Sequence, residues 1–205
     1  SFTGFYHLCR ALLVKSEADF DRFDRCFLQY FKDVPFEQEV SQELLDWLDH
    51  KTDFFTAPAS TRFHGACEGG LCMHSLNVYH ALHDTFFTEG ESEESFAICA
   101  LLHDLCKANY YKPGTRNVKN EATGQWEKVP SYSVEDLFPY GHGEKSVFLI
   151  ERFMKLHIEE AVAIRWHMGG FDDAARGGCF AISEAYDKYP LAVKLHIADL
   201  EATYL

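Results

Sequence analysis

The segment from Phe96 to Leu105 most constrains how this chain folds. It is almost continuously apolar, and only His103 and Asp104 interrupt it. A helix that is apolar on all sides lies at the centre of a helical protein, so we predict a buried helix from Ala97 to Cys106. An ionised Asp in such a helix is unfavourable unless it is paired or bound to a metal. His103 adds a nitrogen ligand, because adjacent helical residues point about 100° apart and can hold a cation together.

Helical patterns recur on both sides of this segment. Apolar residues at three- and four-residue steps predict one helix face, and we expect helices over residues 18–31, 36–49, 71–87, 143–156, 158–167, 179–188 and 190–204. The sequence therefore predicts an all-α fold, a single helical bundle. We expect residues 1–50 to form an N-terminal helical segment packed on a core domain of residues 51–205.

Residues 109–134 differ from the rest of the chain. They contain Pro-Gly and Thr-Gly turn signals with alternating residues around them, which predict a β-hairpin or flap inserted into the helical domain. The insert is also the most basic segment of the chain, through Lys112, Arg116, Lys119 and Lys128. A solvated flap and a substrate lid are both compatible with this pattern.

Composition limits the partners of the protein. The chain carries 32 Asp and Glu against 19 Lys and Arg, a formal net charge of −13. Because phosphate backbones attract basic surfaces, we expect no strong general binding of nucleic acid, although a local basic pocket can still bind a small phosphorylated substrate. No run of 18 apolar residues occurs, which predicts no membrane span. Seven cysteines without a signal peptide predict reduced thiols in a cytoplasmic protein.

Further potential metal ligands interrupt other apolar helices. His74 lies on the predicted helix of residues 71–87, His167 ends that of residues 158–167, and Asp199 interrupts the last one. His142 lies between two glycines just before a helix. Each residue alone is typical of a core His or an exposed Asp. Together with His103 and Asp104, they indicate a metal centre.

These residues resemble a known signature. The pattern His74…His103-Asp104…Asp199 is similar to the H…HD…D signature of the HD-domain metal-dependent phosphohydrolase superfamily. Three flanking segments resemble its bacterial and prophage members: residues 69–76 (GGLCMHSL), 103–107 (HDLCK) and 141–146 (GHGEKS). The resemblance spans residues 41–205. Cys106 departs from it, because many relatives have Gly at that position.

The resemblance implies an all-helical domain that binds one or two divalent cations. His74, His103, Asp104 and Asp199 would hold the first cation, and His142 and His167 a second, with Asp104 bridging the two. Imidazole and carboxylate ligands suit manganese, iron, nickel, cobalt or zinc. The absence of Cys from this set argues against a structural zinc site. We favour two cations, because one cation leaves His142 and His167 without a role.

Several basic residues are candidates for contacts to substrate. Lys107 lies four residues after His103, and we expect it to act with Asp104 in catalysis, either by binding a phosphate oxygen or by protonating a leaving group. An ordinary lysine at a helix end remains an alternative. Arg62, His64 and Lys145 are further candidates for phosphate contacts.

The reaction predicted first is hydrolysis of a phosphoester in a nucleotide or short oligonucleotide by a metal-activated water. A 5′-nucleotidase or nucleoside-triphosphate hydrolase is the nearest alternative. A metal-bearing module that binds a nucleotide without turnover is a second, and a di-iron oxygenase of the HD fold is a third. Lys107 and the basic insert favour phosphate chemistry over the oxygenase.

Overall fold

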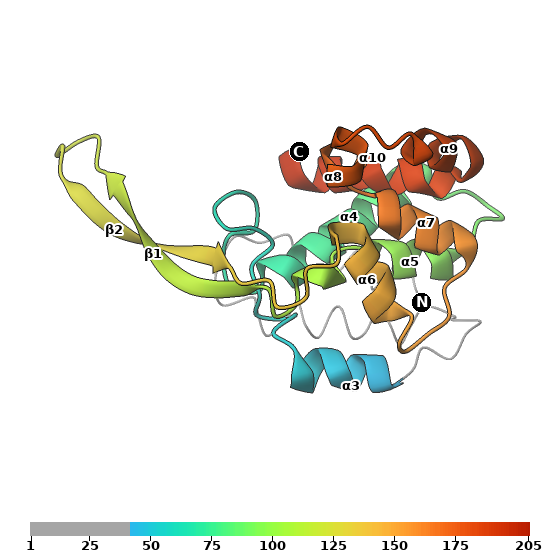
Figure 1. Ribbon diagram of the computed structural model, residues 1–205, viewed down its shortest axis with the longest axis horizontal. Helices are drawn as coiled ribbons and strands as arrows, with labels where there is room; N and C mark the ends of the chain where they lie inside the picture. Colours follow the sequence, from blue (N-terminus) through green and yellow to red (C-terminus); the bar gives the residue numbers. More distant parts are fainter. Residues whose placement is uncertain (1–41) are drawn as a thin grey trace.

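A computed structural model describes residues 42–205 of the chain (Figure 1). This part combines α-helices, two 3₁₀ turns and one two-stranded antiparallel sheet. In chain order the elements are α3 Gln42–Lys51, α4 Gly70–Phe86, α5 Glu93–Leu102, the 3₁₀ turn Leu105–Lys107, β1 Tyr111–Lys119, β2 Trp126–Val134, α6 His142–Ile150, α7 Ile158–Trp166, the 3₁₀ turn Gly169–Phe171, α8 Asp173–Arg176, α9 Ala181–Lys188 and α10 Pro190–Tyr204. Every helix in this range is too short or too polar to traverse a bilayer.

Helix α5 lies in the centre of the core, as its apolar sequence predicts. Every residue from Ala97 to Leu102 is fully buried. Helices α4 and α7 pack against α5, and α10 contacts both of them. The Ser92 hydroxyl caps the start of α5 by accepting the backbone N–H of Ser95. Since His103 and Asp104 follow Leu102 directly, they enter the interior where these helices meet.

The chain turns sharply at the end of α5. The helix ends at Leu102 rather than at the predicted Cys106, because Asp104 adopts φ −101° and ψ 19° and the next residues form the 3₁₀ turn Leu105–Lys107. Lys107 follows Asp104 by three residues, and this turn brings the two side chains side by side, so that they form an ion pair. The prediction that Lys107 lies on one helical face with His103 is therefore wrong.

A β-hairpin occupies the insert predicted at residues 109–134. Strands β1 and β2 pair antiparallel from Tyr111 opposite Val134 to Lys119 opposite Trp126. Asn120 closes the turn, because its side-chain oxygen accepts two backbone N–H groups, those of residues 122 and 123. The hairpin extends away from the helices (Figure 1). The predicted all-α class is wrong, since this sheet gives the described residues a mixed α and β structure.

Most of the other helix boundaries agree with the sequence-based expectation, and α6 is the exception. Helices α4, α7, α9 and α10 each begin and end within two residues of the predicted bounds. Helix α6 ends at Ile150 instead of residue 156, where the Glu151 carboxylate accepts the backbone N–H of Leu156. The short elements at residues 169–176 were not predicted. The helix expected over residues 18–31 lies outside the described residues, as does much of the expected N-terminal segment.

Gly143 permits a close contact between α6 and α7. A Cβ atom on this residue would lie 2.3 Å from the backbone carbonyl oxygen of Arg165. That separation is far inside van der Waals contact, and the obstacle is backbone that cannot rotate away. The contact brings the rings of His142 and His167 to 5.2 Å between centroids. The missing side chain at Gly143 therefore serves helix packing.

We predict that Gly143→Ala destabilises the protein by about 1–3 kcal/mol, because the added methyl group separates α6 from α7. Chemical denaturation followed by circular dichroism measures the change. Gly170→Ala is the matched control, since a Cβ at Gly170 meets no atom within 4 Å. The control should change the free energy of unfolding by no more than about 0.5 kcal/mol. Equal effects of the two substitutions would contradict the packing role of Gly143.

Candidate metal centre

The carboxylate of Asp104 lies between two groups of imidazole rings. Its Oδ2 atom is 3.4 Å from His103 Nε2 and 3.7 Å from His74 Nε2. Its Oδ1 atom is 2.8 Å from His142 Nε2 and 3.5 Å from His167 Nε2. The Asp104 side chain is only 2% exposed. One buried carboxylate therefore faces different histidines with its two oxygens, which is the arrangement of a bridging ligand.

Three of these imidazoles have buried nitrogens without hydrogen bonds. Among the described residues, the Nε2 atoms of His74, His103 and His167 are inaccessible to solvent and have no hydrogen-bond partner. A buried polar atom is normally satisfied, and a group of such atoms around a carboxylate needs an explanation. Convergent imidazole nitrogens and carboxylate oxygens are the ligands of divalent transition metals. The donor set therefore fits a metal ion.

Backbone carbonyls orient two of the rings for ligation. His103 Nδ1 lies 2.8 Å from the carbonyl oxygen of Ala100, and His167 Nδ1 lies 2.7 Å from that of Ile164. Because a carbonyl only accepts, each Nδ1 must carry the proton and donate it. The neutral ring then presents the lone pair of Nε2 to the centre, as metal-binding histidines commonly do.

Asp199 completes the first group of ligands from α10. Its Oδ1 atom lies 3.0 Å from His74 Nε2 and 3.9 Å from His103 Nε2. Burial opposes ionisation of both carboxylates, but the effect of their polar neighbours is larger. His74 holds the pKa of Asp199 well below its usual range, and Lys107 with His103 does the same for Asp104. Both residues are therefore available as anionic ligands.

Potential ligands gather in three overlapping groups in the described part of the chain. Each group offers atoms within 4.8 Å of one another that can hold a metal ion: His74, His103 and Asp104; His103, His167 and Asp199; Asp104, Cys106 and His142. All the ligands predicted from the sequence belong to these groups. Cys106 is an addition that the sequence did not indicate as a ligand.

The glycine pair at the start of α4 brings a further histidine to the centre. A Cβ on Gly70 would lie 2.0 Å from the carbonyl oxygen of Gly65, so only glycine lets the preceding loop pack on the start of the helix. That loop carries His64, whose ring centroid lies 4.9 Å from that of His74. Burial, helped by neighbouring His74 and Lys107, lowers the pKa of His64 to about 4. His64 is therefore neutral at pH 7.

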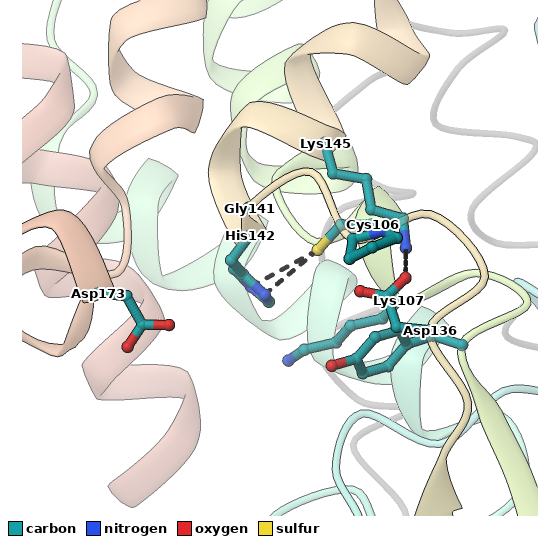
Figure 2. Close-up of a pocket in the computed structure, with 9 residues that line it drawn as sticks. Cys106, Lys107, Asp136, Gly141, His142, Lys145 and Asp173 are labelled. Atoms are coloured by element: carbon teal, nitrogen blue, oxygen red, sulfur yellow. Dashed lines mark hydrogen bonds and ion pairs between the residues drawn. The ribbon is translucent and has the colours of Figure 1, made fainter.

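A pocket of about 350 Å³ opens beside Cys106 and His142. Figure 2 shows Cys106 next to His142, and Lys145 next to Asp136, among the side chains that line it. Lys107 also lines the pocket, and its Nζ lies 2.6 Å from Asp104 Oδ2. Burial opposes the charge on Lys107, but the Asp104 carboxylate raises its pKa. Lys107 is thus a cation at pH 7, which favours binding of phosphate oxygen over donation of a proton.

The predicted substrate contacts fall into two classes. Lys107 and Lys145 line the pocket, and His64 lies against the candidate ligand His74. Arg62 is exposed, does not line this pocket and lies over the ring of Phe63. Asp136 was missed, although it binds Lys145 Nζ at 2.8 Å. Its role depends on the conformation of the segment after β2, which leaves no periodic signal in the sequence.

Arg165 connects α6 and α7, the helices that position His142 and His167. Its guanidinium on α7 contacts Glu144 on α6 and donates to Asp172 Oδ2 at 2.8 Å. Asp172 in turn caps α8 by accepting the N–H groups of residues 174 and 175. His196 on α10 contributes a further tie, with its Nδ1 2.6 Å from the carbonyl oxygen of His167. These contacts hold His142 and His167 in their relative positions.

Comparison of the chain with protein-family models, with curated proteins and with solved structures finds no match in any of the three. The assignment of the site therefore depends on the geometry of its own residues.

We predict that Asp172→Asn lowers stability by about 1 kcal/mol at pH 7, because the amide keeps the cap but loses the charged partner of Arg165. Burial opposes ionisation of the Asp172 carboxyl group, but Arg165 outweighs it and lowers the pKa of Asp172 below its ordinary value of 3.8. A carboxyl group with a depressed folded-state pKa contributes stability above its unfolded pKa and loses it as pH falls further.

The difference in the free energy of unfolding between wild type and Asp172→Asn should therefore be constant from pH 7 to about pH 5, begin to fall near pH 4 and vanish only below the folded-state pKa of Asp172. Urea denaturation with a chelator present measures it across this range. Asp173→Asn, at the exposed neighbouring position, is the control. A difference that does not depend on pH would rule out the ionic contribution.

Proposed function

We propose that this protein is a metal-dependent phosphohydrolase of the HD-domain kind, acting on a phosphoester of a nucleotide or short oligonucleotide. The observation that carries the proposal is the Asp104 carboxylate, which faces His74 and His103 with one oxygen and His142 and His167 with the other. The unsatisfied Nε2 atoms around it support ligation of cations.

We propose two cations. His74, His103, Asp104 and Asp199 would hold one, and Asp104, His142 and His167 the other. The two oxygens of Asp104 face these two groups separately, which supports a bridging role. Mixed imidazole and carboxylate ligands favour manganese, iron, cobalt, nickel or zinc over magnesium, which prefers oxygen ligands and retains its waters.

Bound cations of this kind supply a water of lowered pKa as nucleophile and Lewis-acid polarisation of phosphoryl oxygen. The chain supplies the rest of the site. Lys107 is held beside Asp104 and lines the pocket, so its ammonium group can bind a phosphoryl oxygen and stabilise the charge that develops there. His64 is neutral at pH 7 and can accept or donate a hydrogen bond at the edge of the centre.

The pocket beside the centre supports a substrate of nucleotide size. Its volume of about 350 Å³ lies in the range of small-molecule sites. Lys145 contributes a buried cation, and its Nζ lies 5.1 Å from the ring centroid of Tyr110. The Asp136 carboxylate can accept hydrogen bonds from sugar hydroxyls. A cation, an aromatic ring and an acceptor around one cavity fit the phosphate, base and sugar of a nucleotide.

The other functions considered from the sequence make different demands. A module that only binds nucleotide needs no activated water, and its nucleotide would remain intact after incubation with metal. A di-iron oxygenase needs the same two groups of ligands, but its oxygen chemistry does not itself require two lysines in the pocket, whereas phosphate binding gives both a direct role. Lys107 and Lys145 therefore favour the phosphohydrolase.

We predict that Asp104→Asn lowers phosphoester turnover by roughly 10²-fold or more, because it removes the anionic charge between the two groups of ligands. A chelator should abolish wild-type turnover, and manganese, cobalt, iron or zinc should restore it. Release of p-nitrophenol from mono- and diester substrates measures the rate, and circular dichroism checks the fold. Asp187→Asn is the control, since Asp187 is exposed on α9. Undiminished turnover in Asp104→Asn would refute the assignment.

We predict that the protein binds close to two iron ions per chain at saturation, and that His167→Ala lowers this number toward one. The imidazole of His167 is fully buried, so its removal deletes a ligand that solvent-exposed groups cannot replace. Metal analysis after equilibrium dialysis gives the stoichiometry. His50→Ala provides the comparison, because His50 is exposed on α3. Saturation of the wild type at one ion would eliminate the two-cation centre.

A further inference from the structure

Cys106 lies at the centre proposed above. Many members of the superfamily that the chain resembles have Gly at this position. Its residue is only 3% exposed, and its Sγ atom lies 3.4 Å from Nδ1 and 3.6 Å from Nε2 of His142. His142 Nε2 is in turn 2.8 Å from Asp104 Oδ1. A sulfur, a nitrogen and an oxygen ligand thus lie together at one side of the bridging carboxylate (Figure 2 shows the first two).

We propose that Cys106 is a thiolate ligand of the second cation, together with Asp104, His142 and His167. The proposal rests on the metal centre of the proposed function and specifies its chemistry. On binding, the S–H bond breaks, the proton passes to solvent, and the sulfur lone pair forms the bond to the cation. No electron transfer or further reactant is involved.

The spacing of the atoms supports shared ligation. Zinc binds sulfur at about 2.3 Å and imidazole nitrogen at about 2.0–2.1 Å in tetrahedral sites, so these two ligand atoms lie about 3.6 Å apart. Cys106 Sγ and His142 Nε2 are separated by 3.6 Å. His167 supplies an independent indication of a cation here, because its Nε2 is fully buried, has no hydrogen-bond partner and lies 3.5 Å from the same Asp104 oxygen.

The backbone holds Cys106 in place without help from its thiol. The N–H of Cys106 donates to the Ser146 hydroxyl of α6 at 3.0 Å, which fixes the 3₁₀ turn against that helix. The turn therefore presents whatever side chain stands at this position to His142. A serine can occupy it with little change in volume, which makes Cys106→Ser a usable test.

A thiolate changes which metal the second position prefers. Soft sulfur favours zinc, cobalt or iron over manganese and magnesium, whereas the first group of ligands contains only nitrogen and oxygen. The two halves of the centre therefore differ in chemical character. We infer that the second cation is zinc-like and that the first position accepts a wider range of metals.

Cobalt is the probe that tests this assignment, because a cobalt–thiolate bond gives a charge-transfer absorption in the near ultraviolet and a cobalt bound only by nitrogen and oxygen does not. Apoprotein prepared with chelator and reductant is titrated with Co²⁺, and absorption is recorded with bound metal. We expect the charge-transfer band in wild type and in Cys179→Ser, which changes an exposed thiol. The band should be lost in Cys106→Ser and in Cys106→Gly.

Alkylation of the wild type provides a second measurement that needs no variant. Bound Co²⁺ should slow the reaction of iodoacetamide with Cys106, as mapped by mass spectrometry, while the exposed Cys67 reacts at an unchanged rate. Two ions bound without the band or the protection would overturn ligation by Cys106 and leave the metal centre intact. Failure of Co²⁺ to bind would overturn the metal centre, and the present inference with it.

Discussion

The burial of one ionised carboxylate at the end of an apolar helix determines how the rest of the site is built. Asp104 follows α5, whose last residues are fully buried, and the side chain has almost no access to water. An isolated carboxylate in such surroundings would be strongly destabilising, so the fold must surround it with cations or donors. Lys107 and His142 pair with it directly, and the rings of His74, His103 and His167 surround it with nitrogens that can hold cations beside it. The demand of a single charge thus explains why α4, α5, α6 and α7 converge on one point.

The contacts outside this centre serve to keep its ligands in fixed directions. Carbonyls at the ends of α5 and α7 determine which nitrogen of His103 and His167 carries the proton. The Arg165 contacts and the missing side chain at Gly143 keep α6 close to α7. The carbonyls belong to helix ends, and the Arg165 and Gly143 contacts belong to a helix crossing, so both arise from the packing of the helices. A site that depends on precise ligand directions therefore needs little beyond the packing of the helices themselves.

The sequence predicts some parts of this structure well, and the physical reason is the range of the interactions involved. The buried helix α5 follows from a continuous apolar run, and α10 from its period, because both patterns are local. The sudden turn at Asp104, the proximity of Cys106 to His142 and the pairing of Lys145 with Asp136 depend on tertiary contacts between segments. No local signal encodes them. The all-α prediction was wrong because helical periodicity on both sides outweighed an insert long enough to form a sheet of its own.

If the proposed function holds, the charge of the chain makes bound cations a condition for recognising its anionic substrate. At a formal net charge of −13, the protein as a whole repels phosphate esters. Asp104 and Asp199 add about two negative charges at the centre, and each lysine in the pocket is already paired with a carboxylate, Lys107 with Asp104 and Lys145 with Asp136. Two divalent cations would contribute about four positive charges and reverse the local sign. In this view the acidic ligands, the paired lysines and the proposed thiolate belong to one electrostatic design, in which the metal-free protein excludes the anion that the metal-loaded protein binds.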